Sequence, residues 1–124
     1  MTPMQRTKKV LTDRGIIHQK VEYWNGFVKP HGIRVDLFNI IDIIALDKRI
    51  TGIQVFGTDL SSHKTKIMVT EKEKTMAWLG SGGKLECWGW RKLKKKRGGK
   101  ATYWKPRIID VYMFGEELRW EERK

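Results

Sequence analysis

The chain has 124 residues, with 26 Lys or Arg against 14 Asp or Glu, which gives a formal net charge of +12. This length favours one domain with a hydrophobic core of its own, and the single cysteine, Cys87, excludes an internal disulfide. No apolar run approaches the roughly 20 residues of a transmembrane helix, and the first residues lack the apolar region of a signal peptide. We therefore expect a cytoplasmic protein that binds a polyanion.

The N-terminal segment predicts a short helix over residues 3–14. Thr2 can accept a hydrogen bond from the first turn as the N-cap, and the ring of Pro3 suits the first helical position. Gly15 then ends the helix.

Three strands are predicted next. Residues 16–24 alternate between apolar and polar side chains, and residues 35–46 and 50–56 are apolar runs joined by a tight turn. Runs this rich in Ile and Val are typical of strands buried on both faces, at the centre of a sheet covered by helices. Asp42 and Gln54 lie within these runs, where a polar group is costly.

Helices are expected to follow. Ser61 or Ser62 can cap a helix that runs to about residue 72, and a second helical piece at residues 76–79 ends at Gly80.

The last part of the chain predicts two further strands, over residues 85–93 and 101–114, and a tail over 115–124 that forms a short helix of mixed charge. The element order indicates an α/β (α+β) fold with a mixed central sheet flanked by helices. We expect a single domain over residues 1–114, followed by the charged tail.

The connection between the last two predicted strands is the most basic part of the chain. Residues 91–107 carry nine Lys or Arg side chains and no acidic one, with tryptophans on both sides. Because the segment contains glycines and lies between strands, it does not resemble the basic amphipathic helix of a membrane-binding protein. Lysine acts as a point charge on phosphate, so the composition predicts binding to the nucleic-acid backbone. The predicted DNA-binding residues are Arg91, Lys92, Lys94, Lys95, Lys96, Arg97, Lys100, Lys105 and Arg107.

Asp42 and Gln54 are candidates for a metal site. Side chains two apart on a strand share a face, so a hairpin that closes at residues 47–49 places Asp42 near Gln54 or Phe56. A carboxylate beside an amide oxygen suits Mg²⁺ or Mn²⁺, and such sites serve phosphodiester hydrolysis. The alternatives are a turn-capping role for Asp42 and a hydrogen-bonded core amide for Gln54.

Two apolar segments and the short turn between them resemble the central hairpin of the PD-(D/E)XK nuclease superfamily. The segments are Ile41 to Leu46 and Gly52-Ile53-Gln54-Val55. The likeness is to archaeal and phage Holliday-junction resolvases and to VRR-NUC proteins, and it covers residues 3–114. It implies a restriction-endonuclease-like core with the order α-β-β-β-α-β, and it implies that Asp42 is the main metal ligand.

The resemblance breaks at the (D/E)xK part of the motif. One register places Gln54 at the acidic position of the motif and Phe56 at the lysine position. The other register places Gly52 at the acidic position and Gln54 at the lysine position. Displaced residues could rebuild the site. Glu22 or Asp36 would supply the second carboxylate, and Asp36 is the additional metal ligand we expect. The lysine near the phosphate would be Lys64 or Lys66.

The resemblance implies a metal-dependent DNA endonuclease that takes part in DNA recombination, acts on branched or plain duplex DNA and has a phage or archaeal source. Cutting two symmetric strands would require a homodimer. A second reading is an inactive nuclease-fold protein that binds DNA. A third is an RNA-binding protein, supported only by charge and aromatic content.

Overall fold

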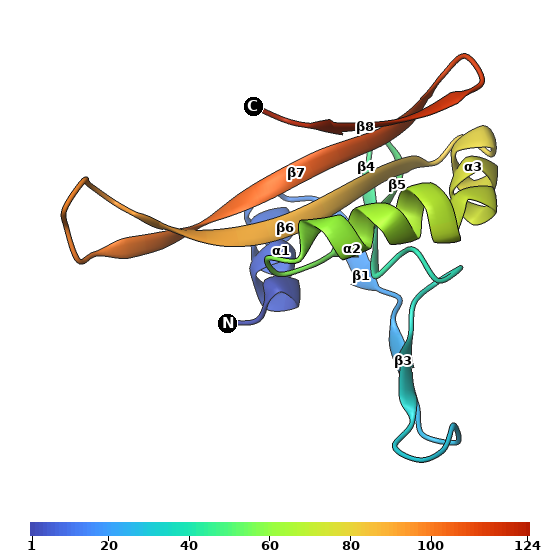
Figure 1. Cartoon of the computed structure of the whole chain (residues 1–124), viewed down its shortest axis with the longest axis horizontal. Coiled ribbons are helices and arrows are strands. Elements are labelled where there is room, and N and C mark those ends of the chain that lie inside the picture. The colour runs from blue at the N-terminus through green and yellow to red at the C-terminus, as the bar shows by residue number, and fades with distance from the viewer.

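The computed structural model describes all 124 residues as a mixed α+β fold around a six-stranded mixed sheet (Figure 1). Every neighbouring pair of strands is antiparallel except β5 and β6, which are parallel. The strand order is β1 (Ile17–Lys20), β4 (Ile43–Asp47), β5 (Arg49–Val55), β6 (Lys84–Lys94), β7 (Thr102–Phe114) and β8 (Glu117–Glu122). The expected mixed sheet with flanking helices is therefore confirmed.

The first helix, α1 (Pro3–Asp13), begins and ends as the sequence predicts. Thr2 and Gln5 form a reciprocal capping box, and Gly15 adopts a φ of +70° just after the helix.

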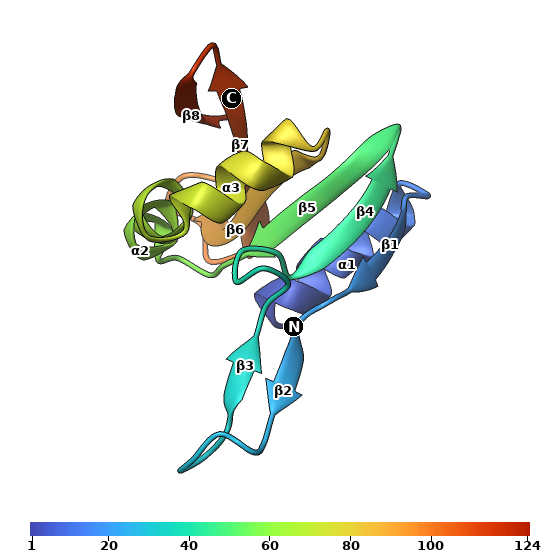
Figure 2. The same ribbon diagram turned by 90° about the vertical axis from the view of Figure 1, so that its right-hand side faces the viewer.

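The predicted first strand, residues 16–24, is divided between two sheets. Its first part is β1, and its second part pairs as β2 (Tyr23–Asn25) with β3 (Ile33–Val35) in a separate two-stranded hairpin. This hairpin extends away from the rest of the molecule (Figure 2).

The apolar run 35–46 is not one strand. Residues 36–42 form a loop in which Phe38 and Asn39 have positive φ angles, and β4 begins only at Ile43. The tight turn to β5 is present, with Lys48 at a φ of +65°, and Ile43 pairs with Ile53. Asp42 thus directly precedes β4, as expected of a residue that opens the strand.

The crossover from β5 to β6 consists of α2 (Leu60–Thr65), a π-helical turn over Lys66–Thr70 and α3 (Lys72–Gly80). The predicted caps, Ser61 and Ser62, are wrong, because Asp59 is the N-cap and its carboxylate accepts the N–H of Ser62. None of the helices combines the length and the apolar character needed to cross a membrane.

The tail over residues 115–124 is not a helix, contrary to expectation. Gly115, at a φ of +63°, makes a turn, and β8 then pairs along β7. Leu118 and Trp120 lie on one side of this strand and pack against the core, so pairing with β7 outweighs the local preference of the glutamates for a helix.

The sheet has an apolar core on each face. Helix α1 covers one face, where Leu11 packs with Ile53, Trp88 and Trp90. The α2–α3 crossover covers the other, where Ile67 packs with residues of the loop before β4 and of β6 and β7 (Figure 1). The candidate site lies at the end of the sheet where β5 terminates, between these two helical layers.

Candidate metal centre and nucleic-acid interface

Three carboxylates converge where the chain enters and leaves the β2–β3 hairpin. Glu22 directly precedes β2, Asp36 directly follows β3, and Asp42 precedes β4. One carboxylate oxygen from each lies within 4.8 Å of the others. The structure therefore brings together both of the second carboxylates that the sequence offered as alternatives.

Asp42 is the most deeply placed of the three, with 4% of its surface exposed. Its Oδ2 accepts the backbone N–H of Val55 at 2.7 Å, while its Oδ1 is buried with no hydrogen-bond partner. Burial raises the pKa of Asp42 to about 8, and the neighbouring Asp36 and Glu22 carboxyl groups add to the rise. A buried oxygen without a partner, facing two further carboxylates, fits a hard divalent cation such as Mg²⁺.

Basic side chains surround the carboxylates. Lys66 Nζ lies 3.0 Å from Asp36 Oδ2, so one of the two predicted lysines reaches the site. Lys64 does not, because its ammonium group lies 6.0 Å from the centre of the Trp120 ring. On the other side, Lys20 and Arg34 lie 3.8 and 4.0 Å from the Glu22 carboxylate.

Gln54 is fully buried, and both ends of its amide have partners in the protein. Its Nε2 donates to the carbonyl of Ile40 at 3.1 Å, and its Oε1 lies 2.9 Å from Nδ1 of His63. A carbonyl can only accept, so the amide nitrogen must face Ile40 and the amide oxygen must face His63. The predicted amide ligand therefore holds a histidine.

This contact fixes the tautomer of His63. Since Gln54 Oε1 is an acceptor, Nδ1 of His63 carries the proton and Nε2 is left with a free lone pair. Burial lowers the pKa of His63, and the positive charge of Lys66 acts in the same direction, so the neutral ring is favoured near pH 7. His63 is not predicted from the sequence, because no other histidine stands at a metal-ligand spacing from it. Its place one helical turn after Asp59 is the only local signal.

Phe56, which stands at the motif's lysine position in one register, supports the histidine. Its ring stacks on the imidazole of His63 with ring centres 5.0 Å apart. On its other side the ring lies against Gly89, where a Cβ atom would collide with it.

Two of the three carboxylates, Glu22 and Asp42, line an open groove of about 570 Å³ between the start of α1 and the end of β5, together with His63. Its charged and titratable lining consists of Lys8, Lys20, Glu22, Arg34, Asp42 and His63. The groove thus combines two carboxylates of the cluster, a neutral base and three cations.

The predicted basic segment forms the far end of the long β6–β7 hairpin, which extends beyond the core (Figure 1). Strand β6 passes the groove as it leaves the sheet, since the N–H of Trp90 bonds to the carbonyl of Gly57. Arg107 alone among the nine predicted DNA-binding residues is ion-paired, at 2.8 Å from Glu122. The other eight charges remain without a counter-ion on the protein.

The tryptophans beside this segment have different environments. Trp88 and Trp90 are buried, and the indole N–H of Trp90 donates to Thr7 Oγ1, so both are core residues. Trp104 is 41% exposed, and the guanidinium of Arg6 lies 3.8 Å from the centre of its ring.

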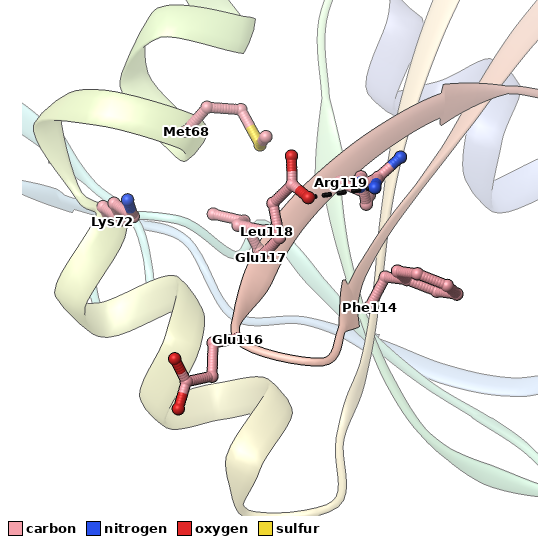
Figure 3. Close-up of a pocket in the computed structure, with 7 residues that line it drawn as sticks. All are labelled: Met68, Lys72, Phe114, Glu116, Glu117, Leu118 and Arg119. Carbon is pink, nitrogen blue, oxygen red and sulfur yellow. Dashed lines mark hydrogen bonds and ion pairs between the residues drawn. The ribbon is translucent and has the colours of Figure 1, made fainter.

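A second hollow, of about 540 Å³, lies between the π-helical turn and the β7–β8 turn (Figure 3). Arg119 pairs there with Glu117 at 2.9 Å, and the hollow includes the exposed ring of Phe114. None of its lining residues has a buried polar atom without a hydrogen-bond partner.

Comparison of the chain with protein-family models, with curated proteins and with solved structures finds no match.

Proposed function

We propose that this protein is a metal-dependent DNA endonuclease of the PD-(D/E)XK type. The carboxylate cluster of Glu22, Asp36 and Asp42, with the orphaned and buried Asp42 Oδ1, is the observation that carries the proposal. The order α1, β1, β4, β5, α2, β6 supports it, because an antiparallel three-strand unit followed by a helical crossover to a parallel strand is what the α-β-β-β-α-β core requires.

The three carboxylates would hold Mg²⁺ or Mn²⁺, which would polarise the scissile phosphate and activate a water molecule. Lys66 compensates the charge of Asp36 and fixes its orientation. Nε2 of His63 is free to accept a proton from the attacking water, and Gln54 keeps that nitrogen unprotonated. Lys8, Lys20 and Arg34 line the groove where the phosphates flanking the cut would lie.

The proposed DNA contact is the β6–β7 hairpin. Eight unpaired cations on one projecting element attract the phosphate backbone without reading sequence. Since β6 leaves the sheet beside the groove, a duplex held along the hairpin reaches the carboxylate cluster.

The decisive experiment measures cleavage of a labelled four-way junction and of a matched linear duplex with Mg²⁺, Mn²⁺ or EDTA. We expect metal-dependent cutting by the wild type and none by Asp42→Asn. Asp47→Asn, which neutralises an exposed carboxylate on the β4–β5 turn, is the matched control and should cut normally. Equal cutting by the Asp42 and Asp47 variants would refute the assigned site.

A catalytically silent DNA-binding protein is the alternative function. It is favoured by one observation, that Gln54 and Phe56 replace the acid and the lysine of the motif and are both buried in contacts with the protein. Tight, salt-sensitive DNA binding without cutting in either metal would select this alternative.

One chain carries one carboxylate cluster, so the nuclease would act on two strands as a homodimer. Sedimentation of Asp42→Asn with a junction should show two protein copies on each DNA molecule. A single copy per junction would be evidence against cutting of paired strands.

A further inference from the structure

The β2–β3 hairpin exposes aromatic side chains beside the carboxylate cluster. Trp24 is 62% exposed and Phe27, in the turn, is 96% exposed. The hairpin pairs with no other strand of the molecule and projects away from the core (Figure 2). Large exposed rings gathered on one projecting element mark an interaction surface.

Both ends of the hairpin are part of the candidate site. Glu22 precedes its first strand and Asp36 follows its second. Within the hairpin, Trp24 pairs directly with Arg34, so their side chains share a face, and Arg34 Nε lies 4.0 Å from Glu22. One face therefore presents an indole ring, a guanidinium and a metal-binding carboxylate in succession.

The charge and the shape of the hairpin favour a polyanion with accessible base faces. Residues 23–35 include Lys29 and Arg34 and no acidic side chain. Gly32, at a φ of +79°, lies so close to Trp24 that a Cβ atom would be 2.9 Å from its ring carbons. The backbone thus supports one side of the indole while most of the side chain stays open to solvent, as in a preformed stacking platform.

We propose that the β2–β3 hairpin binds single-stranded DNA, with Trp24 and Phe27 stacking on unpaired bases next to the phosphate that a metal ion at the carboxylate cluster would bind. The proposal rests on the proposed nuclease function and names its substrate class, DNA with unpaired nucleotides beside the cut. Bases in an intact duplex are covered by their neighbours, so exposed rings stack only where bases are unpaired.

The test compares Trp24→Ser and Phe27→Ser with Phe114→Ser, which removes a 67% exposed ring on the far β7–β8 turn. Binding is measured in EDTA by fluorescence anisotropy of a labelled 20-nucleotide oligodeoxythymidine and of a random-sequence duplex. Each hairpin variant should bind the single strand about 5- to 100-fold more weakly, the range for loss of one stacked base, and the duplex within about twofold of wild type. Phe114→Ser should bind both probes as the wild type does.

Equal losses of affinity for the duplex and the single strand, or no loss of affinity for either, would overturn the proposal. Dissociation of a wild-type dimer into monomers in Trp24→Ser, seen by sedimentation, would also overturn it, because the ring would then belong to a dimer interface. The melting temperature of each variant is also measured, to detect misfolding. Substitutions in the separate hairpin should leave it equal to that of the wild type. The two proposals fail separately. If the wild type cuts DNA but the hairpin variants bind the single strand normally, only the stacking proposal is refuted. If the wild type never cuts but the hairpin variants selectively lose single-strand binding, only the nuclease proposal is refuted.

Discussion

Asp42 occupies a place where a negative charge is unfavourable unless a cation is present. It is buried, two carboxylates face it, and one of its oxygens has no partner. Burial and the neighbouring Asp36 and Glu22 carboxyl groups raise the pKa of Asp42 from an ordinary 3.8 to about 8, so the metal-free group is favoured in its protonated form at neutral pH.

The first prediction is that the metal-free protein loses stability as the pH rises. Below about pH 4 Asp42 is protonated in both states, and between pH 4 and pH 8 only the unfolded state releases its proton. The free energy of unfolding should therefore fall through this window, by at most about 1.4 kcal/mol per pH unit from this group. Urea denaturation in EDTA at pH 5, 6.5 and 8 measures the slope.

Asp42→Asn should remove this part of the slope, and Asp47→Asn should keep it. The difference between wild type and Asp42→Asn isolates Asp42 from His63, whose lowered pKa acts in the opposite direction. Added Mg²⁺ should stabilise the wild type most at pH 8, where the cluster is ionised. Identical slopes in wild type and Asp42→Asn would contradict the assignment.

A second prediction concerns Gln54, whose amide joins the Ile40 carbonyl to His63. Gln54→Met keeps the side-chain volume but leaves both partners unsatisfied, so it should destabilise the fold by about 1–3 kcal/mol for each buried group. Chemical denaturation measures the loss. Gln19→Met, at an exposed site on β1, is the control and should change little; a loss as large in the control would show that the amide contacts are unimportant.

Among individual residues, the resemblance in sequence predicted Asp42 as the main ligand, Glu22 or Asp36 as the second carboxylate, and Lys64 or Lys66 as the lysine. It could not choose between Glu22 and Asp36, since their meeting depends on the separate β2–β3 pairing. It also missed His63, whose role follows from a contact with Gln54 across the start of the crossover helix. Tertiary contacts of this kind leave no local pattern.

At the scale of the elements, β6 packs closely against the Phe56 ring because Gly89 has no side chain. The third prediction is that Gly89→Ala destabilises the protein by about 1–3 kcal/mol, because the added methyl group would collide with the buried Phe56 ring. The same displacement should move His63, which stacks on that ring. Denaturation and the NMR shift of the His63 ring measure both effects. Gly80→Ala, where a methyl group meets no atom within 4 Å, should have neither.

The elements were predictable where an apolar pattern determines them. The strands of the β4–β5 hairpin and the long β6–β7 pair follow from runs of β-branched and aromatic residues. Strand β8 was mistaken for a helix because its glutamates and short length give no strand pattern, and its conformation is decided by the free edge of β7. The π-helical turn at Lys66–Thr70 was likewise invisible, although it is the element that carries Lys66 to Asp36.

Across the whole molecule, the acidic cluster and the most basic segment lie in different elements. Two hairpins, β2–β3 and β6–β7, project from the core (Figure 1). The acidic cluster lies where the chain enters and leaves the β2–β3 hairpin, which exposes aromatic rings, and the β6–β7 hairpin is strongly basic. Both hairpins leave the core at the end of the sheet where β5 ends, so DNA bound along either one in the proposed nuclease would pass the carboxylates. Substitutions in different elements should therefore alter the proposed DNA affinity and the proposed chemistry independently.

The last prediction tests the basic hairpin as the electrostatic contact with DNA. Replacing Lys94, Lys95 and Lys96 by Gln removes three cations that have no ion-pair partner in the protein. If all three contact phosphates, the slope of log K against log salt for duplex binding should become less steep by about 2 to 3, at 0.9 per phosphate contact. Fluorescence anisotropy from 50 to 300 mM NaCl measures it.

A charge-matched control separates local contact from net charge. Lys48→Gln, Lys72→Gln and Lys74→Gln together also remove three cations, but from the β4–β5 turn and from α3. General attraction by a protein of net charge +12 would weaken both triple variants alike. Phosphate contacts along the β6–β7 hairpin predict a changed slope only in the first, because counterions are released only where the DNA lies.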